Sequence, residues 1–305
     1  MKCALIDIGS NSMRLSVYDV NKDSFKTLFH EKDMAGLAGF VDKKHLTPEG
    51  IARACDGLIQ FRETLDQLDI DKVSVFATAS LRNIENTGEA VAEITRRTGF
   101  SIEVVSGHDE AFFGYTGAMY ELGMRDGVFV DIGGASTEIV TFKNSGMLSA
   151  ESIPIGSLRL YADYVKKILP RRSGLVRIEE RVRQELTAVP NDSCSCIAGV
   201  GGTTRAALKL VKKKFSLAAD CREMSAEQLN GLWDTLIKTD KTAINLILKT
   251  EPERIHTIIP GIAILREIVN KFSVQKIVIS NYGVREGYLC HRIQKEIPAT
   301  RKTVS

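Results

Sequence analysis

A short phrase occurs twice in this chain, at residues 7–15 (DIGSNSMRL) and 131–139 (DIGGASTEI). Each copy follows an apolar run and leads into alternating apolar and polar residues, which is the pattern of a β-hairpin with a tight glycine-containing turn. Such turns would expose the backbone N–H groups of residues 9–12 and 133–136 beside Asp7 and Asp131. Backbone amides can bind phosphate oxygens, and a nearby carboxylate can bind Mg²⁺. The repeat therefore predicts a site for phosphate and metal.

The segments around the two phrases follow a similar order in both halves of the chain. Periodicity and turn signals predict a hairpin, then strands that alternate with helices. The expected strands lie at 3–8, 13–20, 24–31, 73–77, 102–105, 128–132, 149–155, 194–198 and 276–280. The expected helices lie at 47–68, 89–97, 108–121, 157–168, 175–187, 226–238, 242–249, 252–272 and 285–296, and a further one follows the loop at 199–204 and ends at about 214. This order predicts two duplicated α/β domains around a cleft, at residues 1–123 and 124–305, with a final helix (about 285–297) that can pack back on the first.

Composition limits the classes of partner and compartment. The chain has 305 residues and a net charge of +3, from 41 basic and 38 acidic side chains. Overall charge therefore predicts no particular partner. No apolar run approaches the roughly 20 residues that cross a bilayer, and the N-terminus lacks the pattern of a signal peptide. We expect a cytoplasmic protein with no membrane partner.

A third glycine-rich loop, at residues 199–204 (GVGGTT), joins a predicted strand to a predicted helix. The N–H groups of Gly201, Gly202 and Thr203 would lie at a helix N-terminus, which suits an anion. An isolated loop of this kind is as often a plain connection, so both interpretations stay open.

Four further segments complete a recognisable pattern: residues 77–82 (ATASLR), 105–111 (VSGHDEA), 153–160 (IPIGSLRL) and 280–287 (SNYGVREG). With the two hairpins, their order and spacing resemble the exopolyphosphatase/guanosine pentaphosphate phosphohydrolase (Ppx/GppA) family from end to end. The longer members carry a C-terminal helical region that this sequence lacks. The resemblance implies two ribonuclease-H-like domains of the acetate kinase/Hsp70/actin superfamily, flanking an active-site cleft. It also implies Mg²⁺-dependent hydrolysis of terminal phosphoanhydrides in polyphosphate or guanosine pentaphosphate, with Mn²⁺ as an alternative ion.

The resemblance also implies roles for single residues. Glu110 takes the place of the catalytic base, and Asp131 and Glu138 match metal and water ligands. Asp7 adds a further oxygen ligand of the kind that Mg²⁺ prefers. The phosphate-binding residues are then expected to be Arg14, Arg82 and Arg285 with the loop residues Gly9, Ser10, Asn11, Ser12, Gly133, Gly134, Ser136, Gly201, Gly202 and Thr203.

Two positions depart from the family pattern. Family members commonly have Glu where Asp109 stands and Gly where Ala135 stands, and the Ala135 methyl group is expected to affect the fine geometry of a loop that approaches phosphate. Glu110 is expected in the first turn of its helix, where the helix N-terminus favours a carboxylate by about 0.3–1 kcal/mol. His108 invites a catalytic role because histidine is the residue type suited to proton transfer at neutral pH, but a surface or turn histidine is the favoured interpretation.

A basic stretch follows in the second half, with seven Lys and Arg residues from Asp163 up to and including Arg183 and a further cluster at Lys209 and 212–214. Solvated helix faces explain it adequately. A track that guides a long polyanion by salt-sensitive electrostatics is the functional alternative. Nucleic acid is not expected, because no aromatic stacking pattern accompanies the charge.

The sequence leaves three functions open: the phosphohydrolase, a sugar or acetate kinase of the same superfamily, and a regulatory module that binds guanosine tetra- or pentaphosphate with little turnover. A homodimer is a plausible guess that no residue pattern compels. Within the hydrolase, the repeat itself suggests a division of labour, because Arg14 aligns with Glu138. The first copy would then bind phosphate, and the second would hold metal and water.

Overall fold

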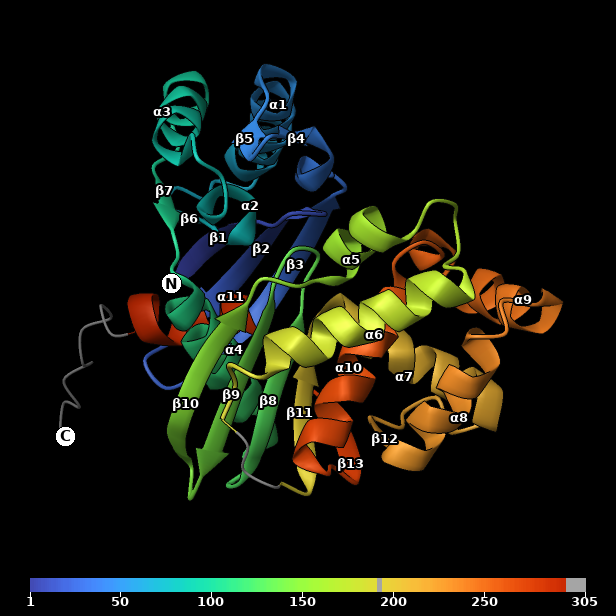
Figure 1. The fold of residues 1–305 in the computed structure, drawn as a ribbon. Coiled ribbons are helices and arrows are strands. Elements are labelled where there is room, and N and C mark those ends of the chain that lie inside the picture. The colour runs from blue at the N-terminus through green and yellow to red at the C-terminus, as the bar shows by residue number, and fades with distance from the viewer. Residues whose placement is uncertain (191–193, 295–305) are drawn as a thin grey trace, which may run out of the picture. The chain divides into compact units, whose positions relative to one another are not determined.

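The structure is a computed structural model that describes residues 1–190 and 194–294. Its contacts divide the chain into two compact units, which we describe separately (Figure 1). The first contains residues 1–106 and the chain from Arg285 onward, and the second contains residues 107–284. This division differs from the boundary at 123/124 that the sequence suggested.

The first unit is built on a five-stranded sheet with the order β3-β2-β1-β6-β7. Its first three strands form an antiparallel meander, and the last two run parallel to β1. The bounds are β1 Lys2–Ile8, β2 Met13–Val20, β3 Phe25–Asp33, β6 Val73–Ala77 and β7 Ile102–Val104, with a small pair at β4 Val41–Asp42 and β5 His45–Leu46. The first predicted hairpin is therefore present, with its turn at residues 9–12.

The helices of the N-terminal part of the first unit are α1 Pro48–Gln67, α2 Ala79–Arg82 and α3 Thr87–Thr98, with a 3₁₀ turn η1 at Leu37–Phe40. Helix α1 begins where the sequence predicts, because the Thr47 hydroxyl caps the Gly50 amide and Pro48 occupies the first helical position. Its apolar stripe, which includes Leu58 and Phe61, is buried in the core of this unit. The short helix α2 escaped the sequence analysis, because four residues carry no readable periodicity.

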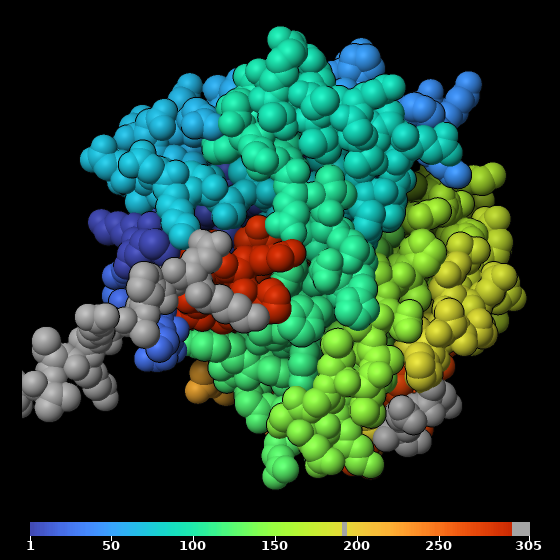
Figure 2. Space-filling model, turned by 90° about the vertical axis from the view of Figure 1, so that its left-hand side faces the viewer, coloured from blue at the N-terminus to red at the C-terminus, as the bar shows by residue number. Residues whose placement is uncertain are grey.

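The end of the described chain also belongs to the first unit. Helix α11 (Val284–Tyr288) continues into a π-helical turn, η3 (Leu289–Ile293), rather than the single α-helix to residue 296 that the sequence predicts. Tyr288 stacks on Phe76 of β6, with ring centroids 4.8 Å apart, and Leu289 and Ile293 are buried. The predicted helix residues after 294 lie outside the described residues. Part of this C-terminal segment is visible in red at the surface in Figure 2.

The second unit repeats this plan in a six-stranded sheet with the order β10-β9-β8-β11-β13-β12. Strands β8, β9 and β10 form the antiparallel meander, and β11 and β13 run parallel to β8. The bounds are β8 Gly127–Ile132, β9 Thr137–Lys143, β10 Gly146–Ile153, β11 Cys196–Val200, β12 Glu223–Ser225 and β13 Lys276–Ile279. The same strand order in both units confirms the duplicated α/β, ribonuclease-H-like fold class.

Helices of the second unit are α4 Gly107–Leu122, α5 Ser157–Tyr164, α6 Arg172–Leu186, α7 Gly201–Phe215, α8 Ala226–Leu236, α9 Lys241–Thr250 and α10 Ile258–Phe272, with a 3₁₀ turn η2 at Pro252–Arg254. Helix α4 belongs here because Ala111, Tyr115 and Ala118 pack against Phe129 and Phe142 of the sheet. This packing explains why the sequence boundary at 123/124 differs from the observed division. Helix α5 ends four residues earlier than predicted, and the predicted helix 252–272 is split by residues 255–257.

No helix in the described part of the chain combines the length and the apolar character needed to cross a membrane.

Candidate active site

The first glycine-containing turn joins β1 to β2. It closes with a hydrogen bond from the Gly9 amide to the Ser12 carbonyl at 3.2 Å. A Cβ on Gly9 would lie 2.9 Å from that oxygen, so a larger residue would force the turn open. The Asn11 carbonyl accepts a hydrogen bond from the Gly36 amide, just before η1, and the Ser10 carbonyl accepts one from the Ala38 amide within η1. No backbone hydrogen bond of the described residues uses the N–H groups of residues 10–12, so these groups can bind an anion.

Three charged side chains gather at the end of this hairpin. Asp7 and Arg14 are paired across β1 and β2, and Arg285, from the far end of the sequence, donates a hydrogen bond to Ser16 Oγ on β2. Burial raises the pKa of Asp7, and the guanidinium groups of Arg285 and Arg14 offset part of that rise. Two of the three predicted phosphate-binding arginines therefore lie in one electrostatic cluster with Asp7.

Arg285 is held in this cluster by the residues that follow it. Tyr18 of β2 donates a hydrogen bond from its hydroxyl to Glu286 Oε1 at 2.7 Å, and Glu286 is buried. The Tyr288 hydroxyl donates to Glu103 Oε2 at 2.7 Å, and Arg292 forms an ion pair with the same carboxylate at 3.0 Å. Burial and the adjacent Glu286 carboxylate raise the pKa of Tyr18, so its hydroxyl stays a hydrogen-bond donor. These contacts fix the backbone that carries Arg285.

Arg82, the third predicted arginine, lies at the end of α2. Its Nη1 donates a hydrogen bond to the Val105 carbonyl at 3.0 Å. Helix α2 is tied to the first hairpin, because Ser80 Oγ donates to the Ile8 carbonyl. Strands β1 and β6 are parallel neighbours, so Arg82 and the turn at residues 9–12 lie at the same edge of the sheet.

The second glycine-containing turn, between β8 and β9, has the same construction. The Gly133 amide donates to the Ser136 carbonyl at 3.0 Å, and a Cβ on Gly133 would lie 3.0 Å from that oxygen. The carbonyls of Gly133 and Gly134 accept hydrogen bonds from the first amides of α5. Ala135 is not among the non-glycine residues with positive φ, so its methyl group introduces no backbone strain into the turn. The local backbone therefore accommodates an alanine at position 135, where family members commonly have glycine.

Asp131 and Glu138 are paired across β8 and β9, at the register position that Asp7 and Arg14 occupy in the first unit. Glu138 is 2% exposed. It accepts a hydrogen bond from Ser152 Oγ of β10 at 2.8 Å and a second one from the Ser136 hydroxyl. Arg14 and Glu138, whose opposite charges distinguish the two repeated phrases, therefore occupy equivalent positions in the two hairpins.

Glu110 and its two predecessors in the first turn of α4 have different environments. Glu110 is 8% exposed, whereas the side chains of His108 and Asp109 are 63% and 49% exposed and lie 4.0 Å apart. His108 is therefore a surface histidine, as the favoured interpretation has it. Burial raises the pKa of Glu138 well above its usual range, and the Glu110 and Asp131 carboxylates raise it further. The three acids of the second unit are thus one electrostatic group.

The β11–α7 loop reaches the same group. Val200 is the β11 neighbour of Asp131, and Gly201 has a φ of +82°, where an added Cβ would overlap Oδ1 of Asp131. Thr203 Oγ1 donates to the Ile132 carbonyl at 3.0 Å. The structure therefore brings the third loop to the acidic pair, which favours the functional interpretation over a plain connection.

Arg254 and Ser152 escaped the sequence analysis. The Arg254 guanidinium lies against Gly202, where any Cβ would overlap it, and forms an ion pair with Glu251 at 3.7 Å. Burial lowers the pKa of Arg254. Neither residue stands in a motif, because each reaches the site only through tertiary packing.

The predicted metal ligands are divided between the units. Asp131 and Glu138 are neighbours in the second unit, and Asp7 belongs to the first. Within residues 1–190 and 194–294, no three or more His, Cys, Asp or Glu side chains are grouped closely enough to hold a metal ion. A metal site that uses all three carboxylates stays a prediction.

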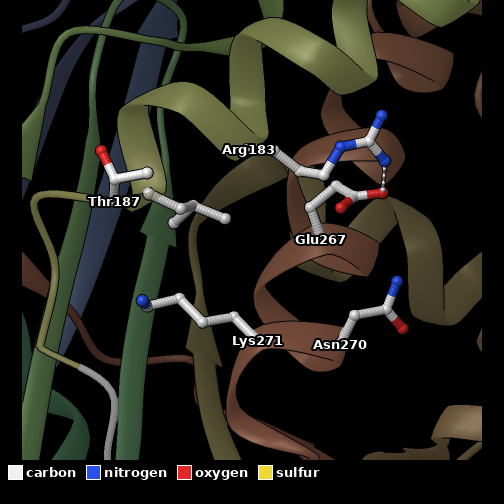
Figure 3. A pocket seen from close by; sticks show the side chains of 6 residues that line it. Arg183, Thr187, Glu267, Asn270 and Lys271 are labelled. Carbon is white, nitrogen blue, oxygen red and sulfur yellow. Dashed lines mark hydrogen bonds and ion pairs between the residues drawn. The ribbon is translucent and has the colours of Figure 1, made fainter.

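A separate hollow of about 340 Å³ lies between α6 and α10 of the second unit. Figure 3 shows Arg183 and Glu267 at one side of it, joined by a contact of 3.4 Å between Nη1 and Oε1. Its lining contains none of the predicted site residues; it consists of Arg183, Leu186, Thr187, Glu267, Asn270 and Lys271.

Comparisons with known proteins agree with the fold and with the pattern of motifs. A crystal structure of the Aquifex aeolicus member of the Ppx/GppA family superposes with a TM-score of 0.80 at 24% identity, covering 98% of this chain and 99% of that one. An exopolyphosphatase from Cytophaga hutchinsonii superposes with a TM-score of 0.83 at 24% identity, covering 95% of this chain and 96% of the other. An exopolyphosphatase-like protein superposes with a TM-score of 0.84 at 21% identity, covering 97% and 100%. These likenesses show the fold.

The sequence comparison shows the family. The family model described as the Ppx/GppA phosphatase family matches residues 16–296, which is most of the chain. The matched range contains Glu110, the second hairpin and Arg285. The chain therefore belongs to the Ppx/GppA phosphatase family.

Proposed function

We propose that this phosphatase releases the terminal phosphate from inorganic polyphosphate, from guanosine pentaphosphate, or from both, with Mg²⁺ or Mn²⁺ as its metal ion. The single observation that carries the proposal is a group of three carboxylates, those of the buried Glu110 and Glu138 and of the half-buried Asp131, beside the second glycine-containing turn and the β11–α7 loop. The Cytophaga hutchinsonii relative is named an exopolyphosphatase, which supports this substrate class.

The chemistry of the carboxylates fits a hard divalent cation. The Glu110 and Asp131 carboxylates raise the pKa of Glu138, so a positive charge beside the three acids would be stabilising. Mg²⁺ is typically bound by one or two carboxylates, with water and substrate phosphates completing its shell. Asp131 and Glu138 would hold the ion, with Asp7 as a further candidate. When bound, it would neutralise charge on the transferred phosphate.

The remaining residues supply positioning and proton transfer. The guanidinium groups of Arg14, Arg82 and Arg285 bind phosphate oxygens, and the free amides of the hairpin turns add neutral donors. Glu110 accepts a proton from a water molecule whose oxygen attacks the terminal phosphorus. The bond from that phosphorus to the bridging oxygen breaks, and the products are inorganic phosphate and a chain that is one phosphate shorter.

The decisive experiment measures phosphate release from tripolyphosphate, long-chain polyphosphate and guanosine pentaphosphate, with Mg²⁺ or Mn²⁺ and no acceptor. Glu110→Gln is expected to lower turnover by about 10²–10⁴ while the fold is retained, because the variant has no base to accept the proton. Asp109→Asn is the matched control: it changes a neighbouring acid whose side chain is about half exposed, and it should leave the rate within about twofold of the wild type.

Three outcomes would contradict the proposal. If Glu110→Gln released phosphate at the wild-type rate, Glu110 could not be the group that accepts the proton from water. Phosphate transfer from ATP to a sugar or acetate, without release in the absence of that acceptor, would favour the kinase alternative. Tight binding of guanosine tetra- or pentaphosphate with no release from any of the three substrates would favour the regulatory alternative.

A further inference from the structure

The loop between α5 and α6 carries a dense group of positive charges. Lys166, Lys167, Arg171 and Arg172 are all exposed. No ion pair to any of these four occurs within the described residues, whereas Arg181 and Arg183, farther along α6, are paired with Glu185 and Glu267. The loop therefore presents uncompensated charge.

The backbone of this loop is anchored, so the charges have a defined place. Val165 is 9% exposed, and its amide donates to the Tyr161 carbonyl at 2.9 Å. Leu169 packs against the core of the second unit, and Pro170 is buried. Ile168, by contrast, is 60% exposed. The apolar residues on either side of Ile168 thus hold the loop while its cationic side chains extend into solvent.

The start of α6 adds to the positive potential. Arg171 is its N-cap, Arg172 is its first residue, no side chain caps the first amides, and the first turn contains no acid. Helix N-termini favour negative charges and disfavour cations. This arrangement is electrostatically unfavourable by itself, and a bound polyanion would relieve it.

The loop is connected to the candidate site by a short, rigid element. The first amides of α5 donate to the carbonyls of Gly133 and Gly134 in the second glycine-containing turn. Helix α5 has 8 residues, so its far end lies about 12 Å from that turn. In Figure 1 the chain runs from the end of β10 through α5 into this loop and then into α6. A linear chain of phosphates held at the turn can extend this far.

We propose that residues 165–172, which are the α5–α6 loop and the first residue of α6, bind the distal part of a long polyphosphate chain and so favour long chains over short ones. The inference rests on the proposed function, because it takes polyphosphate as the substrate. A polyphosphate chain carries about one negative charge per phosphate along an unbranched backbone, which suits four exposed cations with no aromatic stacking partner on the loop.

The test compares two variants that each remove four positive charges. The loop variant carries Lys166→Gln, Lys167→Gln, Arg171→Gln and Arg172→Gln. The control variant carries Lys213→Gln, Lys214→Gln, Lys238→Gln and Lys241→Gln, four exposed lysines on the α7–α9 side of the same unit. All eight positions are exposed, so both variants should fold, and circular dichroism checks this.

Equilibrium binding of fluorescently labelled long-chain polyphosphate and of tripolyphosphate is measured without divalent metal, so that turnover plays no part. The loop variant should bind the long chain about tenfold more weakly, because four exposed charge pairs are lost, and should bind tripolyphosphate within about twofold of the wild type. Its long-chain affinity should also fall less steeply with salt. The variant Arg171→Lys with Arg172→Lys keeps the charge and should bind long chains nearly as well as the wild type.

Several results would overturn the inference. Equal losses in the loop and control variants would show a bulk charge effect. Equal losses for long and short chains would place the loop in the terminal phosphate site. If the loop variant bound polyphosphate as tightly as the wild type but bound single-stranded RNA or phosphatidylglycerol vesicles more weakly, the loop would be assigned to another partner. The two proposals can also fail separately. If the loop variant lost long-chain binding selectively but the wild-type protein released no phosphate, this inference would stand and only the proposed function would be contradicted.

Discussion

Single residues decide which of the many acids in this chain can act at the site. His108, Asp109 and Glu110 are consecutive, yet only the Glu110 side chain is buried. The reason is helical geometry, because neighbouring residues of a helix point in different directions and only one of the three faces the sheet. At the residue scale, the sequence could name Glu110 through its motif. It could not indicate that Ser136 and Ser152 hold Glu138.

The hydroxyl of Ser152 provides a test at this scale. It donates to Glu138 and lowers the pKa of that carboxyl, so Ser152→Ala should raise the pKa further. The variant should then need a higher metal ion concentration than the wild type for phosphate release. This difference in metal requirement should be larger at pH 6.5 than at pH 8.5, because the ionised carboxylate is the metal ligand. Metal titrations of phosphate release at both pH values measure this.

A matched control for Ser152→Ala lies on the same strand. Ser149 is the β10 partner of Thr141, and their hydroxyl groups share a hydrogen bond of 2.8 Å, whereas the β10 partner of Glu138 is Ser152. Ser149→Ala should therefore leave the metal requirement unchanged at both pH values. If Ser152→Ala raised the metal requirement equally at the two pH values, its effect would not depend on the ionisation of Glu138.

At the scale of elements, α6 and α10 share one apolar core and are also joined by ion pairs, one of which uses a buried acid. Glu267 of α10 is 5% exposed. Burial raises its pKa above 4.5, and Arg183 and Arg266 offset only part of the rise. The folded state therefore binds this proton more tightly than the unfolded state does.

The stabilising contribution of protonated Glu267 is fully present below its unfolded pKa of about 4.5 and is lost as the pH rises through the higher folded pKa. The free energy of unfolding of the wild type should thus fall, relative to Glu267→Gln, as the pH rises from 4.5 towards 7.5. Urea denaturation across this range measures it. Glu180→Gln, at an exposed site on α6, is the control, and a constant difference between wild type and Glu267→Gln would contradict the prediction.

Elements also show where periodicity succeeds and where it fails. Helix α1 was predicted from Thr47, Pro48 and its apolar stripe, because caps and amphipathicity are local signals. The break between η2 and α10 was missed. Residues 252–272 read as one apolar pattern, and nothing in that pattern indicates that the residues around Arg254 leave the helix and place the guanidinium over Gly202.

At the scale of the whole molecule, the first unit is completed by residues from the other end of the chain. Tyr288 is 6% exposed, stacks on Phe76 and donates to Glu103. Tyr288→Ala should therefore destabilise the first unit by about 3–5 kcal/mol, the usual cost of removing a buried aromatic ring. Hydrogen exchange should show lost protection in β6 and β7, while β11 and β13 of the second unit keep theirs.

The conservative variant separates packing from hydrogen bonding. Tyr288→Phe keeps the ring and loses only the hydroxyl, so it should cost about 1.5–3 kcal/mol, the value of a hydrogen bond to a charged group. Equal loss of protection in both units for Tyr288→Ala would show that the two units unfold together.

The sequence alone determined the features that depend on neighbouring residues. These are the two glycine-containing hairpins, the alternation of strands and helices, and the residue types that suit phosphate and metal chemistry. These features can be predicted because turns, caps and periodicity depend on residues that are close together in the sequence. Tertiary structure alone decided that α4 packs with the second unit, that Arg285 joins Asp7 and Arg14, and that Arg254 lies over Gly202. Each of these depends on buried surface and charge shared by residues distant in the chain, and no local pattern records it.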